Sequence, residues 1–134
     1  MKWWSILLAS LSAASPVCAQ EPVKWMCKFT SLSHYTGGTE TDLKADKFRV
    51  TNDPFELTFL ETGKQALVLG NAGAAEVGRF RTERGVLQFV ETTPAGTLQV
   101  TAIDKFGNAA HSRNTASLDG SLMPSQAYGK CRKH

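Results

Sequence analysis

Long apolar segments, cysteine and histidine are all scarce in this chain of 134 residues. Only residues 3–11 form a continuous run rich in apolar side chains, and the run is shorter than the ~20 residues that a membrane-spanning helix needs. No window keeps apolar side chains at helical spacing, which argues against a helical fold. The three histidines, His34, His111 and His134, are too scattered for any known zinc spacing. We therefore expect no membrane span, no metal and no cofactor.

The N-terminal segment has the organisation of a secretory signal peptide. A basic residue precedes the short apolar run, and slim residues occupy the third and last positions before the expected cut after Ala19. We therefore predict a signal peptide at residues 1–19 and a single mature domain at residues 20–134, periplasmic or secreted. Cys18 suggests lipidation as an alternative, but the residues before it lack the pattern that lipid attachment requires.

Positive and negative charges are nearly balanced, since 15 Lys and Arg side chains against 12 Asp and Glu give a net charge of +3. The basic residues are spread along the chain instead of forming the dense stripe of a nucleic-acid-binding protein. We therefore expect no nucleic-acid partner. Only residues 130–134, Lys-Cys-Arg-Lys-His, are locally basic, and we interpret them as a solvated chain end.

Cys27 and Cys131 are the cysteines that remain once Cys18 leaves with the signal peptide. An even pair in an oxidising compartment is expected to be joined, so we predict a Cys27–Cys131 disulfide. Closing a loop of about a hundred residues would stabilise the fold by at most ~4.7 kcal/mol. A catalytic thiol is the alternative, but two cysteines at opposite ends of the domain argue against it.

Apolar side chains recur at every second position through most of the chain, which predicts β-strands. In the first strand Trp25, Cys27 and Phe29 share one face, which we expect to point into the core. Further strands are expected at residues 48–50, 55–60, 65–69, 77–82, 86–92, 97–103, 109–115 and 125–131. Residues 33–46 form the longest candidate loop, in which residues 42–47 could make a short helical turn.

Eight or nine short strands at regular spacing are typical of an antiparallel sandwich or a small barrel. Short connections favour a meander in which neighbours in sequence pair in space. If the first and last strands also pair, Cys27 and Cys131 come close enough to be joined. We therefore expect an all-β antiparallel meander, closed or nearly closed into a barrel, with a β-sandwich as the alternative.

The middle of the chain allows the strand register to be predicted. Even loops at residues 84–85 and 93–96 would set Phe80 opposite Phe89, and Phe89 opposite Val100. The core face would then hold Phe80, Leu87, Phe89, Leu98, Val100 and Ala102. The solvent face would hold Arg79, Arg81, Gln88, Val90, Gln99 and Thr101.

His111 and Arg113 are expected to extend that solvent face. An odd loop before them, with Gly107 at a positive φ, would turn the small residues Ala110 and Ser112 into the core. Burying an unpaired arginine is too costly for the opposite arrangement. Donors on this face could hold a carboxylate or an acidic sugar, with an ordinary solvated polar face as the alternative. The candidate ligand-binding residues are Arg79, Arg81, Gln88, Gln99, Thr101, His111 and Arg113.

Motifs that would indicate catalysis or metal binding are missing. Ser112 beside His111 suggests a hydrolase pair, but adjacent strand residues point to opposite faces, so the histidine cannot easily serve as the base. The acidic segment 39–46 lacks the pattern of a calcium loop, and residues 70–73 lack the strand-to-helix setting of a phosphate-binding loop. We therefore expect no catalytic residues.

Three short motifs carry a resemblance: Trp25-Met26-Cys27, His-Ser-Arg-Asn-Thr at residues 111–115, and Pro-Ser-Gln-Ala-Tyr-Gly-Lys-Cys at residues 124–131. In these the chain resembles a group of small exported bacterial proteins that share W-x-C, HSR-x-T and P-S-Q-x-Y-G-x-C and are themselves uncharacterised. The resemblance implies export and paired cysteines, and it brings no activity.

In size, export signal and strand pattern the chain is also similar to the periplasmic lysozyme inhibitors, whose small eight-stranded barrels have cysteines near both ends. Their inhibitory Ser-Gly-x-x-Tyr loop has no clear counterpart here, because residues 31–35 read Ser-Leu-Ser-His-Tyr. We interpret the chain as an exported all-β binding module whose ligand the sequence does not identify, with an anionic glycan or another envelope protein as the candidate partners. Inhibition of a cell-wall hydrolase is the alternative, and a structural envelope protein is a third.

Overall fold

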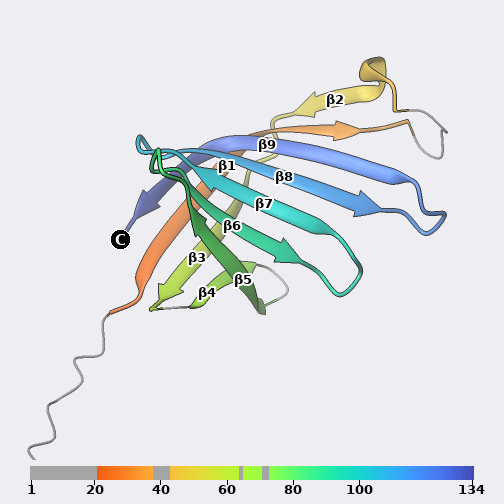
Figure 1. Cartoon of the computed structure of the whole chain (residues 1–134). Coiled ribbons are helices and arrows are strands. Elements are labelled where there is room, and N and C mark those ends of the chain that lie inside the picture. The colour runs from red at the N-terminus through yellow and green to blue at the C-terminus, as the bar shows by residue number, and fades with distance from the viewer. Residues whose placement is uncertain (1–20, 38–42, 64, 71–72) are drawn as a thin grey trace, which may run out of the picture.

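The computed structural model describes residues 21–37, 43–63, 65–70 and 73–134 (Figure 1). The strands are β1 (Val23–Tyr35), β2 (Phe48–Thr51), β3 (Phe55–Thr62), β4 (Gln65–Gly70), β5 (Gly73–Arg81), β6 (Leu87–Thr92), β7 (Leu98–Ile103), β8 (Asn108–Ala116) and β9 (Leu122–Lys133), with a 3₁₀ turn η1 (Ala45–Lys47) before β2. The predicted signal peptide, Cys18, the cleavage site and residues 39–42 of the acidic segment lie outside the described residues. In the described ranges no helix is long and apolar enough to cross a membrane.

Every strand runs antiparallel to its neighbours, in the order β2-β1-β3-β4-β5-β6-β7-β8-β9, and β1 also pairs with β9. Eight strands, β1 and β3 to β9, therefore form a closed barrel, while β2 lies outside it. This confirms the predicted all-β meander and its closure into a barrel. It also confirms the pairing of the first and last strands.

β1 is long enough to serve two partners along one edge. Its residues 23–29 pair with β3, and its residues 32–35 pair with β2. The second half of β1 therefore projects past β3 to β5 together with β8 and β9, and β2 extends this projecting sheet (Figure 1). The predicted loop at residues 33–46 is consequently too long at its start, since β1 continues to Tyr35, and η1 is the short helical turn expected near its end.

The predicted disulfide is present and lies where the barrel closes. Cys27 and Cys131 are directly opposite each other on β1 and β9, with their Cα atoms 3.9 Å apart. The two strands also approach closely at Gly129, two residues before Cys131, because a Cβ on Gly129 would overlap the carbonyl oxygen of Lys28. A β-bulge between Phe29 and Ser31 follows, which adds one residue to β1.

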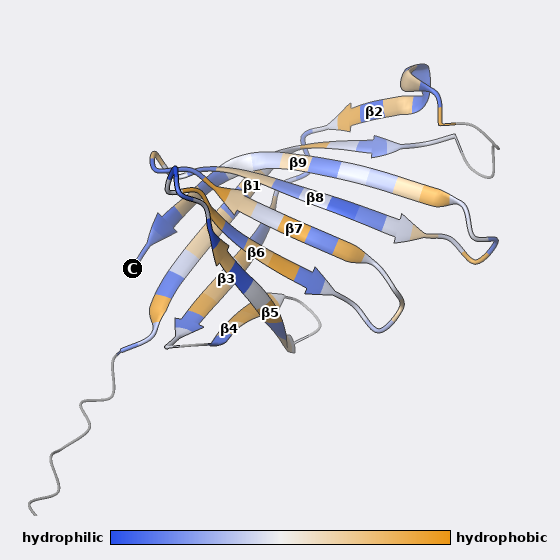
Figure 2. Ribbon diagram, in the orientation of Figure 1, coloured by the Kyte–Doolittle hydropathy of each residue, from blue (hydrophilic) through white to orange (hydrophobic). Residues whose placement is uncertain are grey.

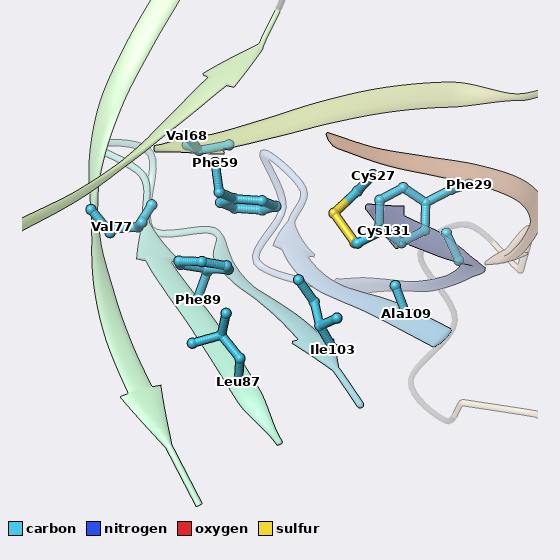
Figure 3. Close-up of a cluster of buried hydrophobic side chains, with 12 residues drawn as sticks. Cys27, Phe29, Phe59, Val68, Val77, Leu87, Phe89, Ile103, Ala109 and Cys131 are labelled. Atoms are coloured by element: carbon cyan, nitrogen blue, oxygen red, sulfur yellow. A yellow bond between two sulfur atoms is a disulfide. The ribbon is translucent and has the colours of Figure 1, made fainter. Parts of the chain in front are cut away.

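Aromatic rings fill the barrel interior in two stacked pairs. The rings of Phe59 and Phe89 lie parallel with centroids 4.2 Å apart, and those of Phe29 and Phe55 lie 4.9 Å apart. Figure 3 shows the first pair facing across the barrel and the disulfide beside Phe29. Leu87, Ile103, Ala109 and Ala127 are buried around these rings. Figure 2 shows polar and apolar residues alternating along the strands, as the sequence pattern predicted.

Four hairpin turns between β5 and β9 share one hydrogen-bond pattern. In each, five residues separate the last paired positions: 82–86, 93–97, 104–108 and 117–121. The amide of the first residue donates to the carbonyl of the fifth, and the amide of the fourth donates to the carbonyl of the first. The fourth residue is a glycine at positive φ, at Gly85, Gly96, Gly107 and Gly120. This is a type I turn followed by a glycine bulge.

The predicted register from β5 to β7 is wrong by one residue, because these loops hold an odd number of residues. Phe89 lies opposite Arg79 and Thr101 instead of Phe80 and Val100. Shifting a strand by one residue exchanges its two faces. Leu87 and Phe89 are core residues as predicted, whereas Phe80, Leu98, Val100 and Ala102 belong to the outer face, where Phe80 is 56% exposed.

Candidate functional site

The sequence-predicted site residues lie mostly on the inside of the barrel wall. Arg79 and Arg81 pair with Phe89 and Leu87, which are core residues. The inner face holds Arg79, Arg81, Gln99, Thr101, His111 and Arg113, and the outer face holds Gln88. The prediction correctly grouped six of the seven on one face, but that face is the inner one. Thr101 and His111 are buried there, whereas Arg79, Arg81 and Arg113 remain exposed.

His111 is buried, only 7% exposed, which corrects the prediction that it faces solvent. Its Nδ1 and the hydroxyl of Thr101 form a hydrogen bond of 2.8 Å, and its ring lies 5.6 Å from Phe29 and 5.8 Å from Phe55. Burial, and secondly the positive charge of Arg113, lower the pKa of His111 to about 4. The imidazole is therefore neutral at pH 7, and it packs in the core as an uncharged ring with one hydrogen bond.

Arg79 and Arg81 are already engaged by their neighbours. Arg79 forms an ion pair through Nε with the buried carboxylate of Glu61, and the indole of Trp25 donates to the other Glu61 oxygen at 2.6 Å. Arg81 donates to the carbonyl of Gly85 at 3.4 Å. Arg79 is therefore tied to the barrel wall by an ion pair, whereas Arg81 is exposed with one long hydrogen bond to its own turn.

Gln99 and Arg113 are cross-strand partners, and Arg113 is exposed. The cavity next to them inside the barrel has a volume of only about 30 Å³ and is lined in part by Gln99, Thr101 and His111. A cavity of that size holds water, whereas ligand sites are typically 300–1,000 Å³. The cavity that Gln99, Thr101 and His111 help to line is therefore too small for a ligand of that size.

Ser112 points to the opposite face from His111, as the alternation along β8 predicted. In the described part of the chain no group of three or more His, Cys, Asp or Glu side chains is placed to hold a metal ion. Residues 31–35, which lack the Ser-Gly-x-x-Tyr sequence of the lysozyme inhibitors, lie within β1.

A groove of about 740 Å³ runs along the outside of the barrel, where β1 lies between β3 and β9. We call it the cationic groove; its lining consists of Met26, Cys27, Lys28, Thr30, Glu56, Leu57, Thr58, Gly129, Lys130, Arg132 and His134. The pairing of Cys27 with Cys131 places Lys28 directly opposite Lys130. The same register places Met26 opposite Arg132.

Like charges directly opposite on neighbouring strands destabilise a sheet. Lys28, Lys130 and Arg132 are nevertheless exposed side by side, and none of them forms an ion pair with a described acidic residue. Glu56 is the one acid among the described residues that line the groove. Glu56 on β3 lies directly opposite Lys28, and Lys130 interacts electrostatically with Asp104. Among the described residues that line the cationic groove, three Lys and Arg side chains against one acid still leave an excess of positive charge.

Sequence reasoning missed this groove, although two signals for it were available. The basic run at residues 130–134 was interpreted as a solvated end. If Cys27 and Cys131 are set opposite each other on antiparallel strands, Lys28 comes to lie opposite Lys130. The chain matches no protein-family model, no curated protein and no solved structure, so the chemistry of the groove has to suggest its function.

Proposed function

We propose that this chain is an exported binding module, without catalytic activity, that holds an anionic glycan in the cationic groove. The observation that carries the proposal is the excess of cations in this lining: Lys28 lies opposite Lys130, and Arg132 takes the next outward position of β9, while Glu56, opposite Lys28, is the one described acid. An anion bridging these cations would relieve their mutual repulsion, so the repulsion in the free protein favours a bound anion.

Export is supported by the Cys27–Cys131 disulfide, because disulfides form and persist in oxidising compartments. A module outside the cytoplasm meets the acidic polysaccharides of cell envelopes and surroundings. The fold supports the binding role, since its interior is filled and its excess of positive charge lies on the outer wall.

The spacing of the cations supports a glycan chain as the ligand. Outward positions on one strand recur every ~7 Å, so Lys130 and Arg132 present charges at a regular interval along the groove. Met26 and Thr58 add an apolar side chain and a hydroxyl in line with Arg132. A linear glycan with carboxylates on successive sugars offers matching anions along one line, together with hydroxyl groups and apolar ring faces.

A pair of double variants with equal charge change tests the proposal. Lys28→Gln with Lys130→Gln removes two cations from the cationic groove, whereas Arg81→Gln with Arg113→Gln removes two from the inner face. Binding of an oligogalacturonate, measured by calorimetry, should weaken about tenfold or more in the first variant and stay within about threefold of wild type in the second.

The methyl-esterified oligosaccharide, which has the same chain without its charges, serves as the ligand control and should bind wild type much more weakly. Raising the salt concentration should weaken binding to wild type more than binding to the lysine variant, because fewer charge pairs remain to be screened. Equal binding by both double variants, or no binding by wild type at low salt, would refute the cationic groove as the site.

A further inference from the structure

A second groove, of about 420 Å³, lies on the outer face of the projecting sheet. We call it the amide-hydroxyl groove; its lining residues come from β1, β2, β8 and β9, with Ser33, Ser112, Asn114, Gln126 and Tyr128 as the polar members used below. The motifs at residues 111–115 and 124–131, which the sequence singled out and the proposed function does not use, supply most of this lining.

Hydroxyl and amide side chains form a continuous row across this groove. Ser112 on β8 pairs with Gln126 on β9, and Gln126 pairs in turn with Ser33 on β1. None of these three side chains forms a hydrogen bond within the described chain. The row therefore presents unused donors and acceptors, and only the amide and hydroxyl kinds.

Tyr128 lies beside the row, on the next outward position of β9 after Gln126, with its ring uncovered. Its cross-strand neighbours are Ala110 on β8 and Ser31 on β1, whose side chains are too small to cover an aromatic ring. Tyr128 is 51% exposed, although aromatic side chains bury large areas when neighbours allow it. Phe48, packed against Tyr35 with ring centroids 5.3 Å apart, contributes a second aromatic ring to the lining.

No charged side chain is among the residues described as lining this groove, in contrast to the cationic groove. A charged ligand would therefore leave water without gaining an opposite charge. A ligand with hydroxyl groups on its edges and C–H groups on its faces fits instead, because the edges can bond to Ser112, Asn114 and Gln126 while a face stacks on Tyr128. Neutral sugars have this chemistry, and the volume suits a short oligosaccharide.

We infer that the amide-hydroxyl groove is a binding site for a neutral oligosaccharide, which stacks a sugar ring on Tyr128 and bonds through its hydroxyls to the Ser112–Gln126–Ser33 row. The inference does not rest on the cationic groove, since the two sites differ in lining and in ligand charge. Both lie along β9, with Tyr128 and Lys130 two positions apart, so one chain with neutral and acidic sugars could occupy both.

The test uses the full mature protein and three neutral probes, maltohexaose, cellohexaose and chitohexaose, in about 0.5 M salt, where ionic contributions are screened. Titration followed by amide NMR shifts should give saturable binding of at least one probe, with the shifts gathered at residues 112–114 and 124–128. Tyr128→Ala and Gln126→Ala should each weaken that binding about tenfold, whereas Tyr128→Phe, which keeps the ring, should stay within about threefold.

Phe80→Ala is the matched control, because Phe80 is an equally exposed outer-face aromatic outside the groove, and it should leave binding unchanged. The lysine double variant of the cationic groove should also leave binding unchanged, which separates this inference from the proposed function. The inference is wrong if none of the probes binds at millimolar concentration, if shifts gather elsewhere, or if Tyr128→Ala and Phe80→Ala bind equally well.

Discussion

His111 shows how a polar residue becomes part of a barrel core. Its ring packs beside Phe29 and Phe55, and its Nδ1 has the hydroxyl of Thr101 as partner. The imidazole avoids the cost of a buried charge by remaining neutral, which is why burial lowers its pKa to about 4. A histidine on a strand could be predicted from the sequence, but the side of the sheet on which it lies depends on the turns.

The pKa of His111 makes stability depend on pH. Between about pH 6.5 and 4 the unfolded chain binds the proton and the folded barrel does not, so the stability is complete above pH 6.5 and falls as the pH drops. We expect the free energy of unfolding to decrease by about 2 kcal/mol between pH 7 and pH 5 from this residue alone. Urea denaturation at both pH values measures it.

His111→Gln supplies the comparison, because glutamine can keep a hydrogen bond to Thr101 and does not titrate. Its denaturation curve should change much less than that of wild type between the two pH values, even if the variant is less stable overall. Parallel losses in both proteins would show that other groups cause the pH dependence.

The recurring five-residue turn decides which face of each strand becomes core. Each turn has Thr, Asp or Ser first and glycine fourth: Thr82 and Gly85, Thr93 and Gly96, Asp104 and Gly107, Ser117 and Gly120. In three of them the side chain of the first residue accepts a hydrogen bond from the backbone amide of the fifth residue, at Thr82, Thr93 and Asp104. Because all four turns hold five residues, the positions that face inward on one strand determine which positions face inward on the next.

This turn explains how much of the fold the sequence could predict. The alternation of apolar residues places the strands to within a few residues. The inward direction of Cys27 and Phe29 is confirmed, because Cys27 has to face its disulfide partner and Phe29 lies on the same face of β1. The predicted register of β5 to β7 is wrong because two loops were expected to hold an even number of residues. Phe80 and Val100 look like core residues by type, and only the count of turn residues shows that they face outward.

Gly107 should be the most sensitive of these turn glycines. Its φ is +80°, and a Cβ there would lie 2.7 Å from the carbonyl oxygen of Cys131, whereas a Cβ on Gly85, at +84°, meets nothing within 4 Å. Both alanine variants carry the cost of a left-handed residue, about 1–2 kcal/mol. Gly107→Ala should lose about 1–3 kcal/mol more than Gly85→Ala in chemical denaturation, because backbone must move. Equal losses would contradict the close packing of this turn on β9.

The barrel as a whole is closed by one strand pair, β1 with β9, and one disulfide. Both could be predicted from two cysteines and a meander. The cationic groove could not be recognised from composition, because Lys28 and Lys130 are 102 positions apart by their sequence numbers and become neighbours only through that closure. The same closure that stabilises the fold therefore creates the candidate site.

Cys131→Ser removes the covalent part of the closure. The free energy of unfolding should fall by about 2–5 kcal/mol, the usual cost of losing a native disulfide from a small secreted domain. Denaturant midpoints of the variant and of wild type measure this difference, and wild type kept in reductant should behave like the variant. An unchanged midpoint would show that strand pairing alone holds the barrel closed.

The central claim is that barrel closure builds a site for an anionic glycan at the cationic groove, and mapping the bound ligand tests it most directly. Amide NMR shifts of the mature protein titrated with oligogalacturonate should change at residues 26–30, 56–58 and 129–132, which border the groove on β1, β3 and β9. Shifts confined to the surroundings of Arg81 and Arg113, or no saturable shifts at all, would contradict it.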